Sequence, residues 1–165
     1  MHHLVISCIG EDKKGLVESL SQVISLHHGN WKVSSLHHLS GYFAGVIQVD
    51  VSAEHSEKLI ESLKGITGLQ CDIRLAEDAK KPEEVNLTLE ITANDRAGII
   101  QEVSAVIHQQ GGNLVKLVST QESAAHSGQL MFKAKAQVSI NDEAIDDIIE
   151  AIENIGNDLI VDISR

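Results

Sequence analysis

One seven-residue pattern occurs twice in the chain. It reads EDKKGLV at residues 11–17 and NDRAGII at residues 94–100. The copies lie 83 positions apart (94 − 11), and the same offset aligns Gly29-Asn30 with Gly112-Asn113. It also aligns Gly45 with Gly128, which we take as equivalent positions. Self-similarity at a fixed spacing over much of a chain predicts two domains of one kind.

The repeat also locates an insertion and a boundary. LQCDI at 69–73 matches LIVDI at 159–163 at an offset of 90, so the second copy holds about seven additional residues (90 − 83). The polar stretch AEDAKKPEE at 76–84 contains the only proline of the chain and has the composition of a linker. We therefore expect one domain at 1–78, a linker at 79–84 and a second domain at 85–165.

Each copy has the hydrophobic pattern of strand, helix, strand, strand, helix, strand. In the first copy the pattern predicts strands at 4–9, 31–40, 46–51 and 69–75, with helices at 15–28 and around 59–66. In the second it predicts strands at 85–93, 114–120, 130–138 and 159–163, with helices at 99–107 and 145–155. The order βαββαβ predicts an α+β, ferredoxin-like domain, an antiparallel four-stranded sheet with two helices on one face. Because such a domain leaves a sheet face and edges open, we expect the copies to pair and the chain to form a homo-oligomer.

Composition narrows the functions that fit. The 165 residues carry a net charge of −11, with −2 up to Pro82 (eight basic, ten acidic) and −9 from Glu83 onward (five basic, fourteen acidic). A chain this acidic is not expected to bind nucleic acid by itself, because such binding depends on Lys and Arg contacts to the phosphate backbone. We expect no membrane segment, because no apolar run approaches about 18–20 residues. The N-terminus lacks a signal-peptide pattern, so the cytoplasm is the expected location.

The repeated D-x-x-G loop is the strongest local signal. Asp12 and Asp95 are expected at helix N-caps, with Gly15 and Gly98 in the first helical turn. A missing side chain there would let a small ligand reach the free N–H groups and positive dipole end of the helix, which favour a carboxylate. The neighbouring acidic residue could accept a hydrogen bond from an ammonium group, so the loop suits a free amino acid. A tight turn needed only by the fold explains the same pattern.

The sequence gives less support to a metal site or to an enzymatic activity than to a ligand-binding loop. The nine histidines include three adjacent pairs, but neighbours on a strand point to opposite faces, and no H-E-x-x-H motif occurs. Cys8 and Cys71 are expected on neighbouring strands as small buried hydrophobes. We expect no metal, no cofactor and no catalytic residue. One enzymatic alternative is an acylphosphatase-like hydrolase that uses Arg96 and Asn113, and a second alternative is an interaction module without a ligand.

The D-x-x-G loop followed by Gly-Asn, repeated in tandem, resembles the ACT family of amino-acid-sensing regulatory domains. LSGYFAGVI at 39–47, GNLVKLVST at 112–120 and SGQLMF at 127–132 further resemble the glycine cleavage system transcriptional repressor family. The resemblance implies a cytoplasmic, non-enzymatic protein that senses glycine or another small amino acid and binds a LysR-type transcription factor.

The resemblance also implies where the ligand lies, at the point where the first loop meets a strand of a neighbouring domain. The residues carried over by position are Asp12, Lys13, Lys14, Gly15, Leu16 and Asn30 in the first copy, and Asn94, Asp95, Arg96, Ala97, Gly98, Ile99 and Asn113 in the second. The family loop often reads D-R-P-G, whereas Lys14 and Ala97 occupy the proline position here. Glu11 against Asn94 makes the second loop the one expected to suit a zwitterion better.

Overall fold

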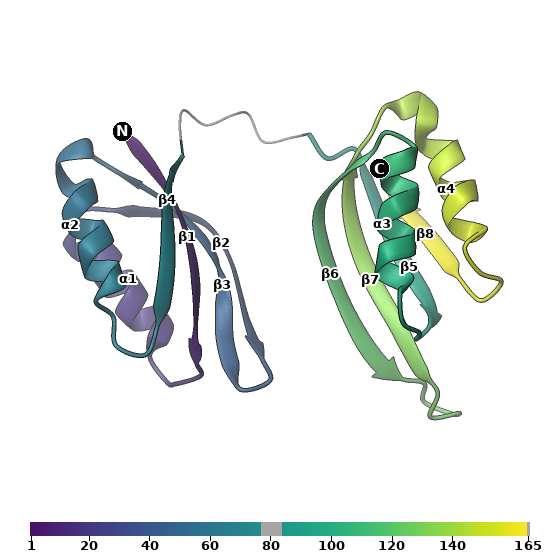
Figure 1. The fold of residues 1–165 in the computed structure, drawn as a ribbon, viewed down its shortest axis with the longest axis horizontal. Helices are drawn as coiled ribbons and strands as arrows, with labels where there is room; N and C mark the ends of the chain where they lie inside the picture. The colour runs from purple at the N-terminus through teal and green to yellow at the C-terminus, as the bar shows by residue number, and fades with distance from the viewer. Residues whose placement is uncertain (77–83, 165) are drawn as a thin grey trace. The chain divides into compact units, whose positions relative to one another are not determined.

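The computed structural model describes residues 1–76 and 84–164. By its internal contacts the chain divides into two compact units, residues 1–81 (unit 1) and 82–165 (unit 2). Of the linker predicted at 79–84, only residue 84 lies within the described part of the chain. Figure 1 shows the two units, each of which is described by itself below.

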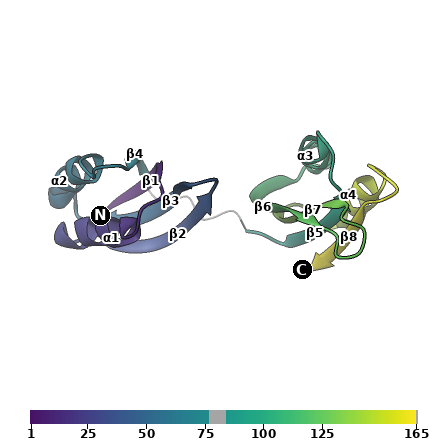
Figure 2. The same cartoon turned by 90° about the horizontal axis from the view of Figure 1, so that it is seen from below.

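Both units have the predicted order of elements. Unit 1 contains β1 (His2–Glu11), α1 (Leu16–Leu26), β2 (Asn30–Leu39), β3 (Tyr42–Val51), α2 (Ala53–Lys64) and β4 (Gln70–Ala76). Unit 2 contains β5 (Leu87–Asn94), α3 (Ile99–Gln109), β6 (Asn113–Ser123), β7 (Leu130–Ser139), the 3-10 turn η1 (Asp142–Ala144), α4 (Ile145–Glu153) and β8 (Ile160–Ser164). The strand orders are β2-β3-β1-β4 and β6-β7-β5-β8, and every pairing is antiparallel. The prediction of two ferredoxin-like α+β folds is confirmed (Figures 1 and 2).

The helices form because their apolar residues recur at helical spacing and cover one face of the sheet. In α1 the buried residues are Leu16, Leu20 and Ile24, each four positions after the last. In α4 they are Ile145, Ile148 and Ile152, while its acidic residues face solvent. Each unit therefore has a core of its own between its helices and one face of its sheet.

The central strands alternate between this core and the open face of the sheet. In β1, Leu4, Ile6 and Cys8 are buried, whereas Val5 and Ile9 between and beyond them are exposed. In β5, Leu87, Leu89 and Ile91 are buried in the same way. This period of two is that of a sheet covered on one side only.

The strand registers locate the insertion of unit 2. Cys8 lies opposite Gly45 and Cys71, and Ile91, 83 positions after Cys8, lies opposite Ala134 and Val161. The offset is therefore 89 at β7 and 90 at β8, and the six residues gained before β7 (89 − 83) lie around the β6–β7 hairpin. The equivalence of Gly45 and Gly128 is wrong, since Gly45 lies within β3 and Gly128 in that hairpin, with a φ of +67°.

Within the described residues, no helix combines the length and the apolar character needed to cross a membrane. The longest of the helices, α2, spans 12 residues.

Candidate functional site

The loop before the first helix of each unit ends on a glycine in the left-handed conformation. Gly15 has φ 87° and ψ 7°, and Gly98 has φ 87° and ψ −3°. Both residues are the N-caps of their helices, and no side chain caps either helix by a hydrogen bond. The prediction that Asp12 and Asp95 are the N-caps, with the glycines in the first turn, is wrong. The chain must pass through a positive φ immediately before each helix, and glycine does so without the steric cost of a Cβ atom.

The space around both glycines is open. A Cβ atom built on Gly98 would meet no atom within 4 Å, and one on Gly15 would meet only the Glu18 Oε2 atom, at 4.0 Å. Both glycines are exposed, as are Lys14 and Ala97 before them, whereas the Leu16 and Ile99 side chains that follow are buried. The loop shape that the two units share therefore depends on the positive φ angle of its glycine, and the space at either glycine is open.

In unit 1 the β2–β3 hairpin holds this loop in place. The Asp12 N–H donates to the Gly41 carbonyl oxygen at 2.9 Å. The Asp12 Oδ2 atom lies 3.3 Å from His38 Nε2. The Asp12 carboxylate thus stays exposed at the loop with one partner beside it.

The unit 1 loop carries two lysines, Lys13 and Lys14. The Lys13 Nζ atom lies 3.6 Å from the position that a Cβ atom on Gly68 would occupy. Lys14 is exposed, and within the described residues neither lysine forms an ion pair. The two lysines and the uncapped helix N-terminus favour a carboxylate, whereas the Glu18 carboxylate, whose Oε2 atom lies 4.0 Å from the Gly15 Cβ position, opposes it.

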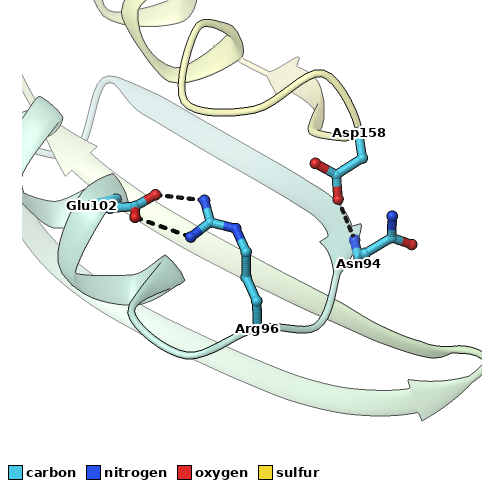
Figure 3. A network of polar contacts seen from close by, with 4 residues as sticks. All are labelled: Asn94, Arg96, Glu102 and Asp158. Atoms are coloured by element: carbon cyan, nitrogen blue, oxygen red, sulfur yellow. Dashed lines mark hydrogen bonds and ion pairs between the residues drawn. The ribbon is translucent and has the colours of Figure 1, made fainter.

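In unit 2 the equivalent loop is tied to its own surroundings. The Asp95 N–H donates to the Leu130 carbonyl oxygen at 2.9 Å, and the Gln121 side-chain amide donates to the Asp95 carboxylate. The Asn94 N–H donates to Asp158 Oδ2 at 2.8 Å (Figure 3). These partners come from β6, β7 and the loop before β8.

The guanidinium of Arg96 in the unit 2 loop also has a partner within the unit. Arg96 binds Glu102 through two hydrogen bonds, one of them 2.9 Å long from Nη1 to Oε1 (Figure 3). The hydrogen bonds to Glu102 raise the pKa of Arg96, and those from Arg96 lower the pKa of Glu102. A ligand carboxylate at this loop would have to compete with the Glu102 carboxylate.

The strand registers explain why the two loops differ. At an offset of 83, Ser19 stands in unit 1 where unit 2 has Glu102. At the offset of 90 that applies before the last strand, Gly68 stands where unit 2 has Asp158. Unit 1 therefore lacks both carboxylates that hold the unit 2 loop.

The two asparagines predicted for the site lie elsewhere in their own units. Asn30 is opposite Asp50, which is opposite His3, whereas the loop follows Glu11, eight positions farther along β1. Eight residues of strand span about 27 Å. Asn113 likewise lies opposite Ser139, eight positions along β7 from the Met131 that faces Asn94. A single unit does not bring its asparagine to its own loop.

Sequence reasoning missed the residues that surround the loops, namely His38, Gly41, Glu102, Gln121 and Asp158. Most of them reach the loop from hairpins and turns far along the chain, so no local spacing marks them. Glu102 is the exception, because it follows Arg96 by six residues and lies in the first turn of α3. A basic residue before a helix with an acidic first turn was the signal available.

Other candidate chemistry does not assemble. Among the described residues, no three His, Cys, Asp or Glu side chains come together in a way that could hold a metal ion. Cys8 and Cys71 lie on neighbouring strands, directly opposite each other, as free thiols. Burial, with a smaller contribution from Cys8, raises the pKa of Cys71 to about 11.

Both units have the same strand order and an open loop before the first helix. Residues 2–74 match the family model of the ACT domain. The resemblance to ACT domains is confirmed by this match, which lies within unit 1, and unit 2 has the same strand order. No curated protein sequence matches the chain.

Two solved structures have the fold of the whole chain. One is a protein of unknown function from Galdieria sulphuraria, 23% identical, with a TM-score of 0.83, covering 99% of this chain and 97% of its own. The other is described as a candidate glycine cleavage system transcriptional repressor. It is 15% identical, has a TM-score of 0.75, and covers 99% of this chain and 98% of its own. Both likenesses concern the two-unit fold.

Proposed function

We propose that the chain is a non-enzymatic regulatory protein of the cytoplasm that binds a small amino acid, glycine first among them. The ligand would control, through protein contact, a LysR-type transcription factor of the glycine cleavage system. The observation that carries the proposal is the exposed, left-handed glycine before an uncapped helix, present in both units. The fold shared with a candidate glycine cleavage repressor supports the regulatory role.

The unit 1 loop is the stronger of the two proposed sites. The ligand carboxylate would lie at the start of α1, near the N–H groups of its first turn and the ammonium groups of Lys13 and Lys14. The ligand ammonium would lie toward Asp12. In unit 2, Arg96 and Asp95 already have partners, so binding there must first break contacts within the protein. This reverses the expectation from Glu11 and Asn94 alone.

Asn30 and Asn113 could contact a ligand only at the loop of another domain. Each lies at the far end of the sheet from its own loop. A site that combines Asp12 with Asn30 therefore needs the asparagine of another ACT domain, as the family resemblance implies. Gly98, Ala97 and Ile99 form the corresponding second loop, with the same backbone and a weaker electrostatic attraction for carboxylate.

The positions of Arg96 and Asn113 do not favour the acylphosphatase-like alternative. That reaction needs an arginine to hold the phosphate and an asparagine to orient water in one place. Arg96 is bound to Glu102, and Asn113 lies at the opposite end of the unit 2 sheet. The two residues of the hypothesis are not neighbours within their unit.

Calorimetric titration of the full chain with glycine, alanine, serine and larger amino acids tests the ligand. We expect binding of a small amino acid, and stabilisation of about 2.7 kcal/mol at a ligand concentration 100 times the dissociation constant. The double variant Lys13→Ala, Lys14→Ala should bind about tenfold more weakly, since each factor of ten is about 1.4 kcal/mol. Arg96→Ala is the matched control in unit 2, and it should leave the tightest affinity unchanged. Absence of binding by every amino acid at millimolar concentration would refute the sensor.

Co-elution of the chain with the LysR-type activator of the glycine cleavage operon tests the regulation. A ligand can shift an equilibrium only if it binds one state more tightly than the other. We expect glycine to change the affinity of the complex, and Asp12→Ala to abolish that change. A complex of the same affinity with and without glycine would identify the interaction module without a ligand.

A further inference from the structure

The two cysteines of the chain lie directly opposite each other on neighbouring antiparallel strands. Cys8 of β1 is the register partner of Cys71 of β4, and both are free thiols. Residues that face each other across two antiparallel strands project to the same side of the sheet. That side is the one covered by the helices, because Cys8 belongs to the unit 1 core and Cys71 packs against it. The fold therefore brings both thiols of the chain together in one row of one sheet.

The backbone spacing at this pair is that of a disulfide. Opposite residues of an antiparallel pair have Cα atoms about 4.5 or about 5.5 Å apart, depending on whether they are hydrogen-bonded. Both values lie within the range of about 4.4–6.8 Å found in disulfides. The register between β1 and β4 runs without a break from His3 to Ile9. A bond between the two sulfur atoms therefore requires rotation of the side chains rather than movement of a strand.

The Cys8 thiol has one competing contact. Its Sγ atom donates to the Gly45 carbonyl oxygen at 3.7 Å. Gly45 is the register partner of Cys8 on β3, on the opposite side of β1 from Cys71. A thiol is a weak donor, and a disulfide has no donor left to satisfy. The loss of this contact is therefore a small cost of turning the Cys8 sulfur toward β4.

Unit 2 shows that the fold does not require cysteine at these positions. Ile91 and Val161 match Cys8 and Cys71 by register, and they also lie directly opposite each other. They pack in the unit 2 core as the cysteines pack in the unit 1 core. Ordinary aliphatic side chains thus fill this row of the sheet, so packing alone does not account for two thiols in unit 1.

We propose that Cys8 and Cys71 form a modification site, at which a low-molecular-weight disulfide such as oxidised glutathione converts the two thiols into a disulfide bond between β1 and β4. Cys71 is half-buried, whereas Cys8 is 4% exposed, so the Cys71 sulfur attacks first. This attack forms a mixed disulfide and releases one small thiol. The Cys8 sulfur then attacks the Cys71 sulfur, and the second small thiol leaves. The two protein thiols give up two electrons and two protons, and the small disulfide takes them up as two thiols.

The bond joins the two strands close to the D-x-x-G loop of unit 1. Cys8 lies four residues before Asp12, and Cys71 lies three residues after Gly68. The backbone is already in close contact at this end of the sheet, because a Cβ atom on Gly10 would collide with the Gly68 carbonyl oxygen. Oxidation therefore restrains β4 against β1 in unit 1 and leaves unit 2 unchanged. The inference does not depend on the proposed amino-acid ligand.

The surroundings of the thiols set the speed of the reaction. Burial raises the pKa of both cysteines, that of Cys71 to about 11. The thiolate is the form that attacks a disulfide, so the rate of oxidation should rise about tenfold with each pH unit from about pH 7 to about pH 10. A thiol of high pKa is also a poor leaving group, which slows the reduction of the bond. The disulfide therefore forms slowly near neutral pH and persists once formed.

Incubation of the folded full chain with oxidised glutathione, followed by mass spectrometry, tests the proposal. We expect the chain to lose the mass of two hydrogen atoms, peptide mapping to recover Cys8 joined to Cys71, and dithiothreitol to restore both thiols. The matched control is Cys71→Val, which carries the residue of unit 2 and retains a single thiol. Circular dichroism confirms that this variant is folded, and Cys71→Ser replaces it if it is not.

Urea unfolding of the oxidised and reduced chains measures the effect on unit 1. Trp31 packs against the unit 1 core, so its fluorescence follows that unit. We expect a higher unfolding midpoint for the oxidised natural chain, because the bond restricts the unfolded chain, and no change on the same treatment of Cys71→Val.

Four results would overturn the proposal. A folded chain that keeps both thiols even at alkaline pH, or that holds only mixed disulfides with glutathione or links to a second copy, would show that the two sulfur atoms do not meet. A bond that forms only in urea would show that the native strands do not bring them together. A lower midpoint for the oxidised chain would mean that the bond distorts the native sheet.

Discussion

Units 1 and 2 share a backbone fold but carry different side chains on the open sheet face and at the loop before the first helix. At five positions of the open sheet face, unit 1 has valine, isoleucine or leucine where unit 2 has threonine, lysine or glutamate, whereas Ser35 and Gln70 of unit 1 match Val118 and Ile160 of unit 2. At the loop, Lys13 and Lys14 of unit 1 form no ion pair with any residue that the structure describes, whereas Arg96 of unit 2 binds Glu102. The cores, the strand orders and the left-handed glycines are common to both. The shared features specify the fold, and we infer that the features that differ between the units are related to function.

The largest effect that separates the units is expected inside the sheet. A Cβ atom on Gly45 would lie 2.1 Å from the Ser35 carbonyl oxygen, a backbone atom that cannot move aside. Unit 2 accommodates Ala134 at the matching position. Gly45→Ala should destabilise unit 1 by about 3 kcal/mol, whereas Ala134→Gly should cost unit 2 about 1 kcal/mol.

Urea unfolding measures this difference. The only tryptophan of the chain, Trp31, lies in unit 1 and packs against its core, so its fluorescence follows that unit. Circular dichroism follows both units. If Gly45→Ala leaves the fluorescence midpoint unchanged, the close approach of β2 and β3 at Gly45 is contradicted.

A smaller effect, equal in both units, is expected at the loops. Gly15 and Gly98 have the same φ of +87° and open surroundings. Gly15→Ala and Gly98→Ala should each cost about 1–2 kcal/mol, the strain of a left-handed residue with a Cβ atom. Asparagine at either position should cost less, because it enters this region more readily. A much larger loss at one glycine than at the other, in the same urea experiment, would mean that its surroundings are packed.

The smallest effect is expected at the ion pair that only the unit 2 loop possesses. Arg96→Ala should lower the unfolding midpoint of unit 2 slightly at neutral pH. The folded pKa of Glu102 is lowered by Arg96, so the stabilisation is present above the unfolded pKa of Glu, about 4.3, and is lost as the pH falls through the folded value. Lys13→Ala, at the matching position of unit 1, should leave stability unchanged. An Arg96→Ala effect that is as large in acid as at neutral pH would exclude the ion pair as its cause.

Hydrophobic periodicity predicted the order of the strands and helices because each element buries one regularly spaced set of residues. Leu16, Leu20 and Ile24 have the same spacing in the sequence and in α1. The position of the insertion was not predictable from a constant offset, since residues gained near the β6–β7 hairpin shift every later match. Gly45 was therefore aligned with Gly128, and only the strand register identifies Ala134 as its counterpart.

The site was predictable only in part. The repeated glycine identified the loop, but aspartate is the more common N-cap, so the cap was assigned to Asp12 and Asp95. His38, Gln121 and Asp158 come to the loops from distant strands and turns, and no local pattern records that approach. The family resemblance implies a site where the loop meets a strand of a neighbouring domain, and within its own unit Asn30 lies at the far end of the sheet from the loop.

Backbone amide shifts measured by NMR during a titration of the full chain with glycine show whether the loops bind the ligand. We predict that the amides of Gly15, Leu16 and Val17 shift at lower ligand concentration than those of Gly98, Ile99 and Ile100. We also predict that the double variant Lys13→Ala, Lys14→Ala weakens the response of the unit 1 amides and leaves that of the unit 2 amides unchanged. If no small amino acid moves the amides of either loop at millimolar concentration, the chain is not an amino-acid sensor of the kind proposed.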